Sequence, residues 1–418
     1  MKILHINTMD YGGAAKACLR LHQGLLLEGV SSKVLFKYKT SQIPETYFFT
    51  PPPTDFVEKL KNKVIRISQE LKLLPYLSTQ EKLEISLRKQ RKGLEYFSYP
   101  FAPTDITKNP LYKEADIIHL HWVADFLDWK SFFAKNCKPI VWTLHDQNPF
   151  LGIEHYAERF LGIDENGKPI PRKYTPQEIA EEKKMISFKK KILEKVDNLI
   201  IVAPSKWLME ESQKSEVLGK YPHYHIPYGF PTEIFKPYNK FFCQEILGLP
   251  KEKKLILFVA DSVDNHRKGF AFLKKALEGI ENKEVILCAV GSKASIENKD
   301  NLIELGRIQD ERLMAMAYSA ADVFVIPSLE DNLPNTMIES LLCGTPVVGF
   351  PVGGILDVVE NGENGYICEN IDVSSLQDTI EKSIYYSFCR EEIALKAKEK
   401  FSLCVQAKNY IELYKKLY

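Results

Sequence analysis

Short apolar runs rich in β-branched residues alternate with helical stretches along most of the chain. In the first half these runs are 3–6, 32–36, 117–121, 140–144 and 199–203. In the second half they are 255–260, 285–290, 302–305, 323–326 and 346–349. Apolar strands separated by helices indicate parallel sheets that are covered on both faces. The pattern therefore predicts an α/β protein with two Rossmann-like halves.

A segment rich in proline separates the two halves. Residues 226–237 hold three prolines and Gly229, which suit an extended linker better than a helix or strand. We therefore predict a first domain over 1–225 and a second over 226–400. A last helix over 401–418 is expected to pack back on the first domain. Its predicted buried stripe consists of Val405, Tyr410, Ile411, Leu413 and Leu417.

The charge balance argues against a nucleic-acid partner. The chain has 56 Lys and Arg against 55 Asp and Glu, for a net charge of +1, so it lacks the positive field that binds phosphate backbones. With 45% hydrophobic and 27% charged residues, the composition is that of a folded protein. The eight cysteines are dispersed and never form a C-x-x-C pair, which predicts reduced core cysteines of a cytoplasmic protein.

The sequence predicts neither a signal peptide nor a transmembrane helix. Residues 1–3 begin the first strand directly, and apolar runs such as 255–260 are far shorter than the roughly 20 residues that a bilayer requires. Any membrane contact is therefore expected to be peripheral.

Residues 55–99 fit the two-sheet scheme poorly and are interpreted as an insertion in the first domain. Basic helical stretches lie at 56–66 and 88–92. One interpretation is contact with an anionic membrane surface or a lipid-linked acceptor. The other is the solvated face of an ordinary surface helix.

The most informative stretch is 327–348. A strand is expected to end at Ile326, a polar loop with Glu330 and Asp331 follows, and a helix opens near Asn335 and stops at Gly344. The loop carboxylates therefore lie beside a helix N-terminus at the carboxyl edge of the sheet. At that edge, free backbone N–H groups favour phosphate or sugar oxygens.

Two other loops have residues suited to phosphate. Arg267 and Lys268 follow the first strand of the second domain, where two cations can neutralise the charge of a phosphate group. Gly12 and Gly13 follow the first strand of the chain and allow backbone amides to approach a phosphate. Because this loop is not G-x-G-x-x-G, a nicotinamide dehydrogenase is disfavoured.

Histidines gather where two strands of the first domain end. His119 and His121 share a face and line either a pocket or a packed wall, of which the wall is preferred. Since no third and fourth ligand appears at metal spacing, we predict no metal site. His145 ends the next strand.

In order and spacing, these motifs resemble the family 4 retaining glycosyltransferases (group 1), which have the GT-B fold of two Rossmann-like domains facing across a cleft. The match rests on the Gly-Gly loop, His145, the segment 204–207, the linker, the Arg-Lys-Gly loop and the acidic helix. Asp331 and Glu339 have the family's spacing of eight positions. The family's first acid is usually Glu, which here stands one position early as Glu330, and its additional Arg is Ser262 here.

The resemblance implies roles for individual residues. His145, Arg267, Lys268 and Asp331 are the implied catalytic residues. Asp331 or Glu330 would hold sugar hydroxyls, Glu339 the ribose, and His145 the sugar from the opposite domain. The base would rest near Arg307 and Ile308. The further implied substrate contacts are Gly12, Gly13, Asn332, Leu333, Asn335 and Thr336.

The implied activity moves a sugar from a UDP- or GDP-linked donor to a glycan or lipid-linked glycan acceptor, with retention of configuration and without metal or cofactor. A role in cell-surface polysaccharide or glycolipid synthesis is expected. The expected location is the cytoplasm. A peripheral position at the inner face of the plasma membrane is the other expectation. The alternatives are a sugar-nucleotide epimerase of the same architecture and a non-catalytic nucleotide-sugar-binding protein.

Overall fold

The computed structural model describes residues 1–51, 63–65, 67–68, 79–91, 93–260, 265–280, 284–291 and 302–417. The predicted helical stretch 56–66 falls almost wholly outside these residues, as does Ser262. Among the described helices, none is long and apolar enough to cross a bilayer.

The first domain is built around a seven-stranded sheet, all parallel, in the order β3-β2-β1-β4-β5-β8-β9. Its elements are β1 (Lys2–Met9), α1 (Gly13–Leu27), β2 (Ser31–Tyr38), β3 (Thr46–Phe48), α3 (Thr79–Gln90), η1 (Ile106–Lys108), α4 (Pro110–Glu114), β4 (Ile117–Leu120), α5 (Trp129–Lys135), β5 (Ile140–Thr143), α6 (Pro176–Leu193), β8 (Leu199–Ala203), α7 (Lys206–Lys214) and β9 (His223–His225). A small antiparallel pair, β6 (Phe160–Ile163) and β7 (Pro169–Pro171), stands apart from the sheet.

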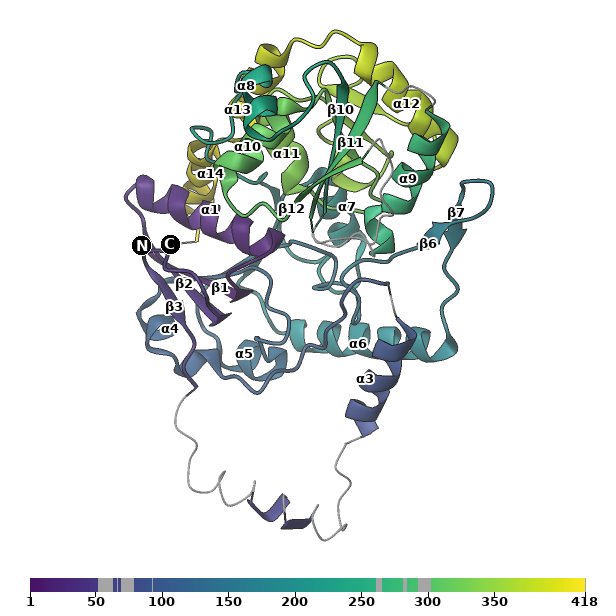
Figure 1. The fold of residues 1–418 in the computed structure, drawn as a ribbon. Coiled ribbons are helices and arrows are strands. Elements are labelled where there is room, and N and C mark those ends of the chain that lie inside the picture. The colour runs from purple at the N-terminus through teal and green to yellow at the C-terminus, as the bar shows by residue number, and fades with distance from the viewer. Residues whose placement is uncertain are drawn as a thin grey trace.

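The second domain has a six-stranded parallel sheet in the order β12-β11-β10-β13-β14-β15. Its elements are α8 (Lys240–Ile246), β10 (Lys254–Ala260), η2 (His266–Lys268), α9 (Phe270–Gly279), β11 (Val285–Gly291), β12 (Leu302–Gly306), α10 (Glu311–Ala320), β13 (Val323–Ile326), α11 (Asn335–Leu342), β14 (Val347–Gly349), η3 (Gly353–Ile355), β15 (Gly365–Ile367), α12 (Val373–Tyr385) and α13 (Arg390–Phe401). The predicted α/β class with two Rossmann-like domains is confirmed, and Figure 1 shows the two lobes.

The strand orders locate the ligand-binding edges. Strand order reverses beside β1 in the first sheet and beside β10 in the second. In open parallel sheets, ligands bind beyond the carboxyl ends of the strands at such a switch point. The loops after β10 and β13 are those that the sequence singled out.

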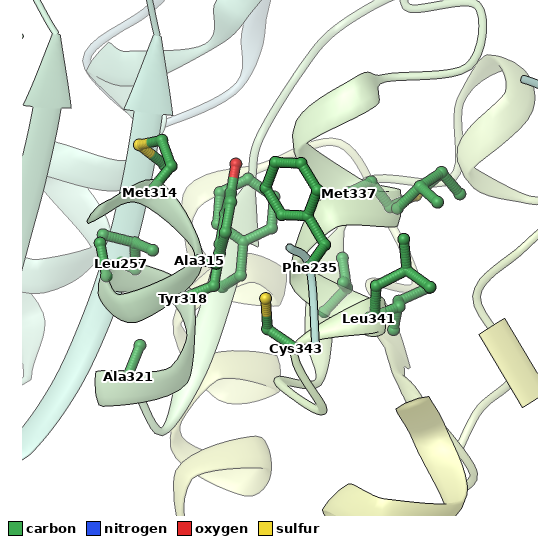
Figure 2. Packing of buried hydrophobic residues seen from close by; sticks show 14 of the residues in the cluster. Phe235, Leu257, Met314, Ala315, Tyr318, Ala321, Met337, Leu341 and Cys343 are labelled. Carbon is green, nitrogen blue, oxygen red and sulfur yellow. The ribbon is translucent and has the colours of Figure 1, made fainter. Parts of the chain in front are cut away.

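A cluster of apolar side chains holds α10 and α11 against the second sheet. Figure 2 shows Phe235 from the linker among Met314, Tyr318, Met337 and Cys343. Tyr318 is fully buried, and burying an aromatic side chain of this size stabilises a fold by about 1.5–3 kcal/mol. This packing fixes α11 against the sheet and therefore also fixes the acidic loop that precedes it.

The last helix, α14 (Leu403–Lys415), lies against α1 of the first domain (Figure 1). Tyr410 and Leu413 are buried there together with Leu21. The sequence prediction was wrong for Val405, which is 36% exposed. At 3.6 residues per turn, the five positions to Tyr410 rotate Val405 by about 140°, away from the buried stripe. The predicted domain boundaries stay predictions.

The prediction of core cysteines is corrected for three positions. All eight thiols are free, but Cys137, Cys389 and Cys404 are exposed. Cys389 and Cys404 flank or begin helices whose apolar faces point inward, and apolar neighbours in the sequence do not fix the side on which a residue lies.

Candidate active site between the two domains

The acidic loop between β13 and α11 places Asp331 at the carboxyl end of the second sheet. Asp331 is 6% exposed, and its Oδ2 accepts hydrogen bonds from Lys268 Nζ at 2.7 Å and from Ser328 Oγ at 3.2 Å. Burial alone would raise the pKa of Asp331, but the charges of Lys268 and Arg267 outweigh it and lower that pKa. Asp331 is therefore held as a carboxylate between two cations.

Close backbone contacts fix this loop. A Cβ atom added at Gly353 would lie 1.8 Å from the carbonyl oxygen of Asp331, and one added at Gly354 would lie 1.8 Å from that of Asn332. Gly353 also has a positive φ of 52°, which favours glycine. Only glycines at η3 allow the acidic loop to sit this close.

The two predicted cations lie in η2, directly beside the acidic loop. Arg267 Nη1 donates to the carbonyl oxygen of Glu330 at 2.9 Å, and its guanidinium lies 4.0 Å from the ring centroid of Tyr156. Gly269 ends η2 with a φ of 67°, and a Cβ there would meet the carbonyl oxygen of Pro327 at 1.8 Å. The Lys-Gly pair thus belongs to a tight junction between the loops after β10 and β13.

The insertion supplies a partner for Arg267 that sequence reasoning missed. Glu95 Oε2 accepts hydrogen bonds from Arg267 Nη2 at 2.6 Å and Nε at 3.0 Å, and from Asn265 Nδ2 at 3.0 Å. Burial opposes ionisation of Glu95, yet the Arg267 charge and hydrogen bonds, with Lys268, lower its pKa to about 2. Nothing in the pattern of 55–99 signalled this contact.

His145 lies at the end of β5 with both ring nitrogens engaged. Nδ1 is 2.8 Å from the hydroxyl of Tyr228, and Nε2 is 3.0 Å from Nδ1 of His121. His121 Nε2 in turn lies 2.9 Å from Nδ1 of His5. Burial, only weakly opposed by Asp146, lowers the pKa of His145 to about 4, so its ring is neutral near pH 7. In this arrangement neither ring nitrogen is free for a sugar.

His119 forms the packed wall that was preferred over a pocket. Its ring nitrogens lie 2.6 Å from the Tyr414 hydroxyl and 2.7 Å from the Thr143 hydroxyl. The His119 and His121 rings pack with centroids 4.2 Å apart. These contacts join the ends of β4 and β5 to α14.

One group in the described residues has the composition of a metal site. Ligand atoms of His5, Cys18 and His121 lie within 4.8 Å of one another, all buried. Burial raises the pKa of the Cys18 thiol, which disfavours the thiolate that binds a metal. His5 and His121 are hydrogen bonded to each other. We therefore assign no metal to this group.

The glycine loop and α11 meet across the domain interface. Asn335 Nδ2 donates to the carbonyl oxygen of Gly13 at 3.0 Å, and Gly12 precedes α1 with a φ of 87°. Asn332 Nδ2 donates to the carbonyl oxygen of His145 at 3.2 Å, and its Oδ1 accepts from Ser205 Oγ at 2.6 Å. Residues predicted from distant parts of the sequence are therefore brought together.

Glu339 is buried within a second ion pair between the domains. Its Oε1 accepts from Arg20 Nη2 at 2.8 Å, and its Oε2 accepts from the Tyr318 hydroxyl at 3.1 Å. Arg20 also donates to Glu311 at 2.7 Å and lies over the ring of Phe230. Both oxygens of the predicted ribose ligand thus have protein partners, and the role of Arg20 on α1 had no signal in the sequence.

Two further acids complete the site. Glu330 Oε2 accepts from the backbone N–H of Glu158 at 3.0 Å, and burial raises the pKa of Glu330. Glu158, which the sequence did not single out, has a positive φ of 42°. Burial raises its pKa to about 7, although the backbone N–H of Glu95 partly offsets this.

The remaining predicted contacts lie apart from this centre. Leu333 is a predicted substrate contact. In the structure its side chain is 4% exposed and belongs to the apolar core behind the acidic loop. Ile308 packs partly against the same core, and Arg307 is exposed after β12. Thr336 lies in the first turn of α11 and is partly exposed.

Residues 253–384 match the family described as Glycosyl transferases group 1. The chain is 23% identical over 280 residues to D-inositol 3-phosphate glycosyltransferase of Mycolicibacterium smegmatis, which covers 64% of this chain and 59% of that protein. It thus spans about three fifths of the length of this curated relative.

Solved structures match the fold over the full length. Sucrose-phosphate synthase from Thermosynechococcus elongatus has a TM-score of 0.67 at 17% identity and covers 100% of this chain and 99% of its own. Anabaena Alr3699/HepE in complex with UDP-glucose has a TM-score of 0.66 at 16% identity and covers 100% of both chains. The GT-B fold expected from the sequence is confirmed, and the resemblance to the group 1 glycosyltransferases is confirmed over residues 253–384.

Proposed function

We propose that this chain, whose second domain matches the group 1 glycosyltransferases, transfers a sugar from a nucleotide diphosphate sugar to an acceptor hydroxyl with retention of configuration. The observation that supports this best is the Lys268–Asp331 pair at 2.7 Å, set beyond the switch point of the second sheet, where the next residue, Asn332, contacts the carbonyl oxygen of His145 in the first domain. Cations at this edge suit a diphosphate leaving group. That Anabaena Alr3699/HepE was solved with UDP-glucose supports a UDP-linked donor.

In the proposed reaction, Lys268 and Arg267 stabilise the charge that develops on the departing diphosphate. The amino end of α11, which Asn335 opens, adds its unpaired N–H groups. Asp331 or Glu330 holds the sugar hydroxyls. The buried neutral rings of His145 and His121 enclose the sugar from the side of the first domain. No metal is required in this scheme, because side-chain cations take the charge.

The first experiment is a thermal-shift screen of UDP- and GDP-linked sugars, because a ligand that binds only the native state raises the melting temperature. The best donor is then incubated without acceptor. Slow hydrolysis supports transfer, isomerised donor supports the epimerase, and binding without either reaction supports a binding protein. Absence of any shift would contradict the proposal.

The acid that contacts the sugar is tested with Asp331→Asn and Glu330→Gln in the same assay. The variant that loses turnover while the nucleoside diphosphate still binds identifies the sugar ligand. Equal rates in both variants and the wild type would exclude both acids.

We also propose a glycan or lipid-linked glycan acceptor and peripheral contact with anionic membranes through residues 55–99. Lys63 is exposed, whereas Lys59, Lys61 and Arg66 lie outside the described residues. Co-sedimentation with anionic and neutral vesicles tests the contact, with all four residues changed to Gln. Equal pelleting of wild type and variant would exclude it.

A further inference from the structure

The stretch 93–99, which ends the insertion, reaches the loop after β10 in the second domain. The backbone N–H of His266 donates to the carbonyl oxygen of Gly93 at 3.1 Å, and Asn265 Nδ2 donates to Glu95 at 3.0 Å. The insertion therefore forms part of the domain interface at the two cations of the site.

Arg267 is held on several sides. Its Nε and Nη2 donate to Glu95, its Nη1 donates to the carbonyl oxygen of Glu330, and its guanidinium stacks on Tyr156. The Arg267 side chain is 7% exposed, whereas that of Lys268 is 31% exposed. Arg267 is thus the fixed cation of the pair and Lys268 the accessible one.

Glu95 is itself fixed by a closed ring of hydrogen bonds. The backbone N–H of Glu95 donates to both carboxylate oxygens of Glu158 at 2.9 Å, and the N–H of Glu158 donates to Glu330 Oε2 at 3.0 Å. Arg267 closes the ring by donating to Glu330 and to Glu95. Glu158 has a positive φ without being glycine, a conformation that persists where surrounding contacts enforce it.

We propose that Glu95 is a positioning residue of the site: it fixes the guanidinium of Arg267 so that its charge faces the departing diphosphate. This inference rests on the proposed function. A charge that is already oriented stabilises a transition state without reorganisation, so its placement affects turnover more than substrate binding. Lys268, which pairs with Asp331 and is more exposed than Arg267, contacts the donor in the ground state.

The direct test compares Glu95→Gln with the wild type, using the donor found in the thermal-shift screen. We expect kcat to fall about 10-fold or more, since misplacement by about 1 Å can cost 10²-fold, while the donor KM changes less than about 2-fold. Glu84→Gln is the matched control, because Glu84 lies on α3 of the same insertion and pairs with Arg88 rather than with Arg267 or Lys268. Melting temperatures verify that both variants are folded.

Chemical rescue separates positioning from a merely structural role. If Glu95 binds the guanidinium, millimolar guanidinium should restore part of the activity of Arg267→Ala. The restoration should disappear in Arg267→Ala/Glu95→Gln but persist in Arg267→Ala/Glu84→Gln. Equal rescue in the two double variants, or no rescue of Arg267→Ala at all, would overturn the inference.

The outcomes distinguish this inference from the proposed function. Wild-type protein that neither binds nor turns over a nucleotide sugar would overturn both. An active wild type with unchanged kcat in Glu95→Gln would overturn the positioning role alone.

Discussion

The two sides of the domain interface are built from different chemistry. On the first domain, His145, His121 and His5 form a buried line of hydrogen-bonded neutral rings. On the second domain, Arg267 and Lys268 surround the carboxylate of Asp331. One side therefore resists protonation through burial, and the other retains charges through pairing.

The difference follows from where each group lies in its sheet. His5 and His119 are opposite one another in the middle of neighbouring parallel strands, where burial penalises any charge. Arg267 and Lys268 instead lie in a loop beyond β10, where carboxylates and partial exposure offset desolvation. Charged side chains are therefore stable in the loop after a strand, whereas side chains in the middle of the sheet are more stable when neutral.

The sharpest test of the ionic side is Lys268→Ala. Turnover should fall by about 100-fold or more, because one contact to developing charge is lost in a water-poor site. Initial rates with the identified donor measure this. Lys274→Ala, on the exposed face of α9, is the control. A folded Lys268→Ala protein with wild-type rates would show that the charge of Lys268 does not contribute to the reaction.

The ion pair between Arg20 and Glu339 is the second ion pair between the two domains, in addition to that of Glu95 and Arg267. Glu339→Ala should weaken binding of the bare nucleoside diphosphate by about 10-fold, since a hydrogen bond to a charged group contributes about 1.5–3 kcal/mol. Calorimetric titration measures the affinity. Unchanged affinity would mean that Glu339 serves Arg20 alone and not a ribose.

The neutral side should appear in the pH dependence of stability. An unfolded chain binds a proton on each histidine near pH 6.5, but folded His145 does so only near pH 4, so the unfolding free energy should fall as pH decreases between these values. His145→Gln should flatten this part of the curve in denaturant titrations at several pH values. His266→Gln, at the partly buried start of η2, is the control. If the unfolding free energy depends on pH equally in the two variants, burial does not keep His145 neutral.

The smallest expected effect is that of chelation. If side-chain cations suffice on the ionic side, activity should be the same with and without EDTA. Rates measured after dialysis against EDTA test this. Loss of activity that manganese restores would show that the ionic side requires a metal.

The elements that set the fold were predictable because they obey local rules. The run 255–260 is apolar throughout and became β10, and the helix expected near Asn335 begins there as α11. Likewise Arg267, Lys268 and Asp331 follow strand ends, so the parallel sheet brings them together.

What could not be predicted depends on contacts between distant segments. Arg91, expected in a solvated or membrane-facing stretch, is 5% exposed and pairs with Glu154 and Glu178. Glu95 and Arg20 belong to otherwise ordinary segments, and only their placement across the interface gives them charged partners. Periodicity tells which face of an element is buried but not which side chain meets which across two domains.

Phe230, in the predicted linker, lies beside Ser402, which precedes the last helix, and the two segments are hydrogen bonded to each other. Phe230 donates to the carbonyl oxygen of Phe401 at 2.8 Å, and Leu403 donates to that of Phe230 at 3.2 Å. Two connections that are hydrogen bonded to each other restrict the relative motion of the two sides more than a single connection would. The hydrogen bonds from Asn332 to His145 and from Asn335 to Gly13 both span the interface, so any separation of the two sides must break both of them.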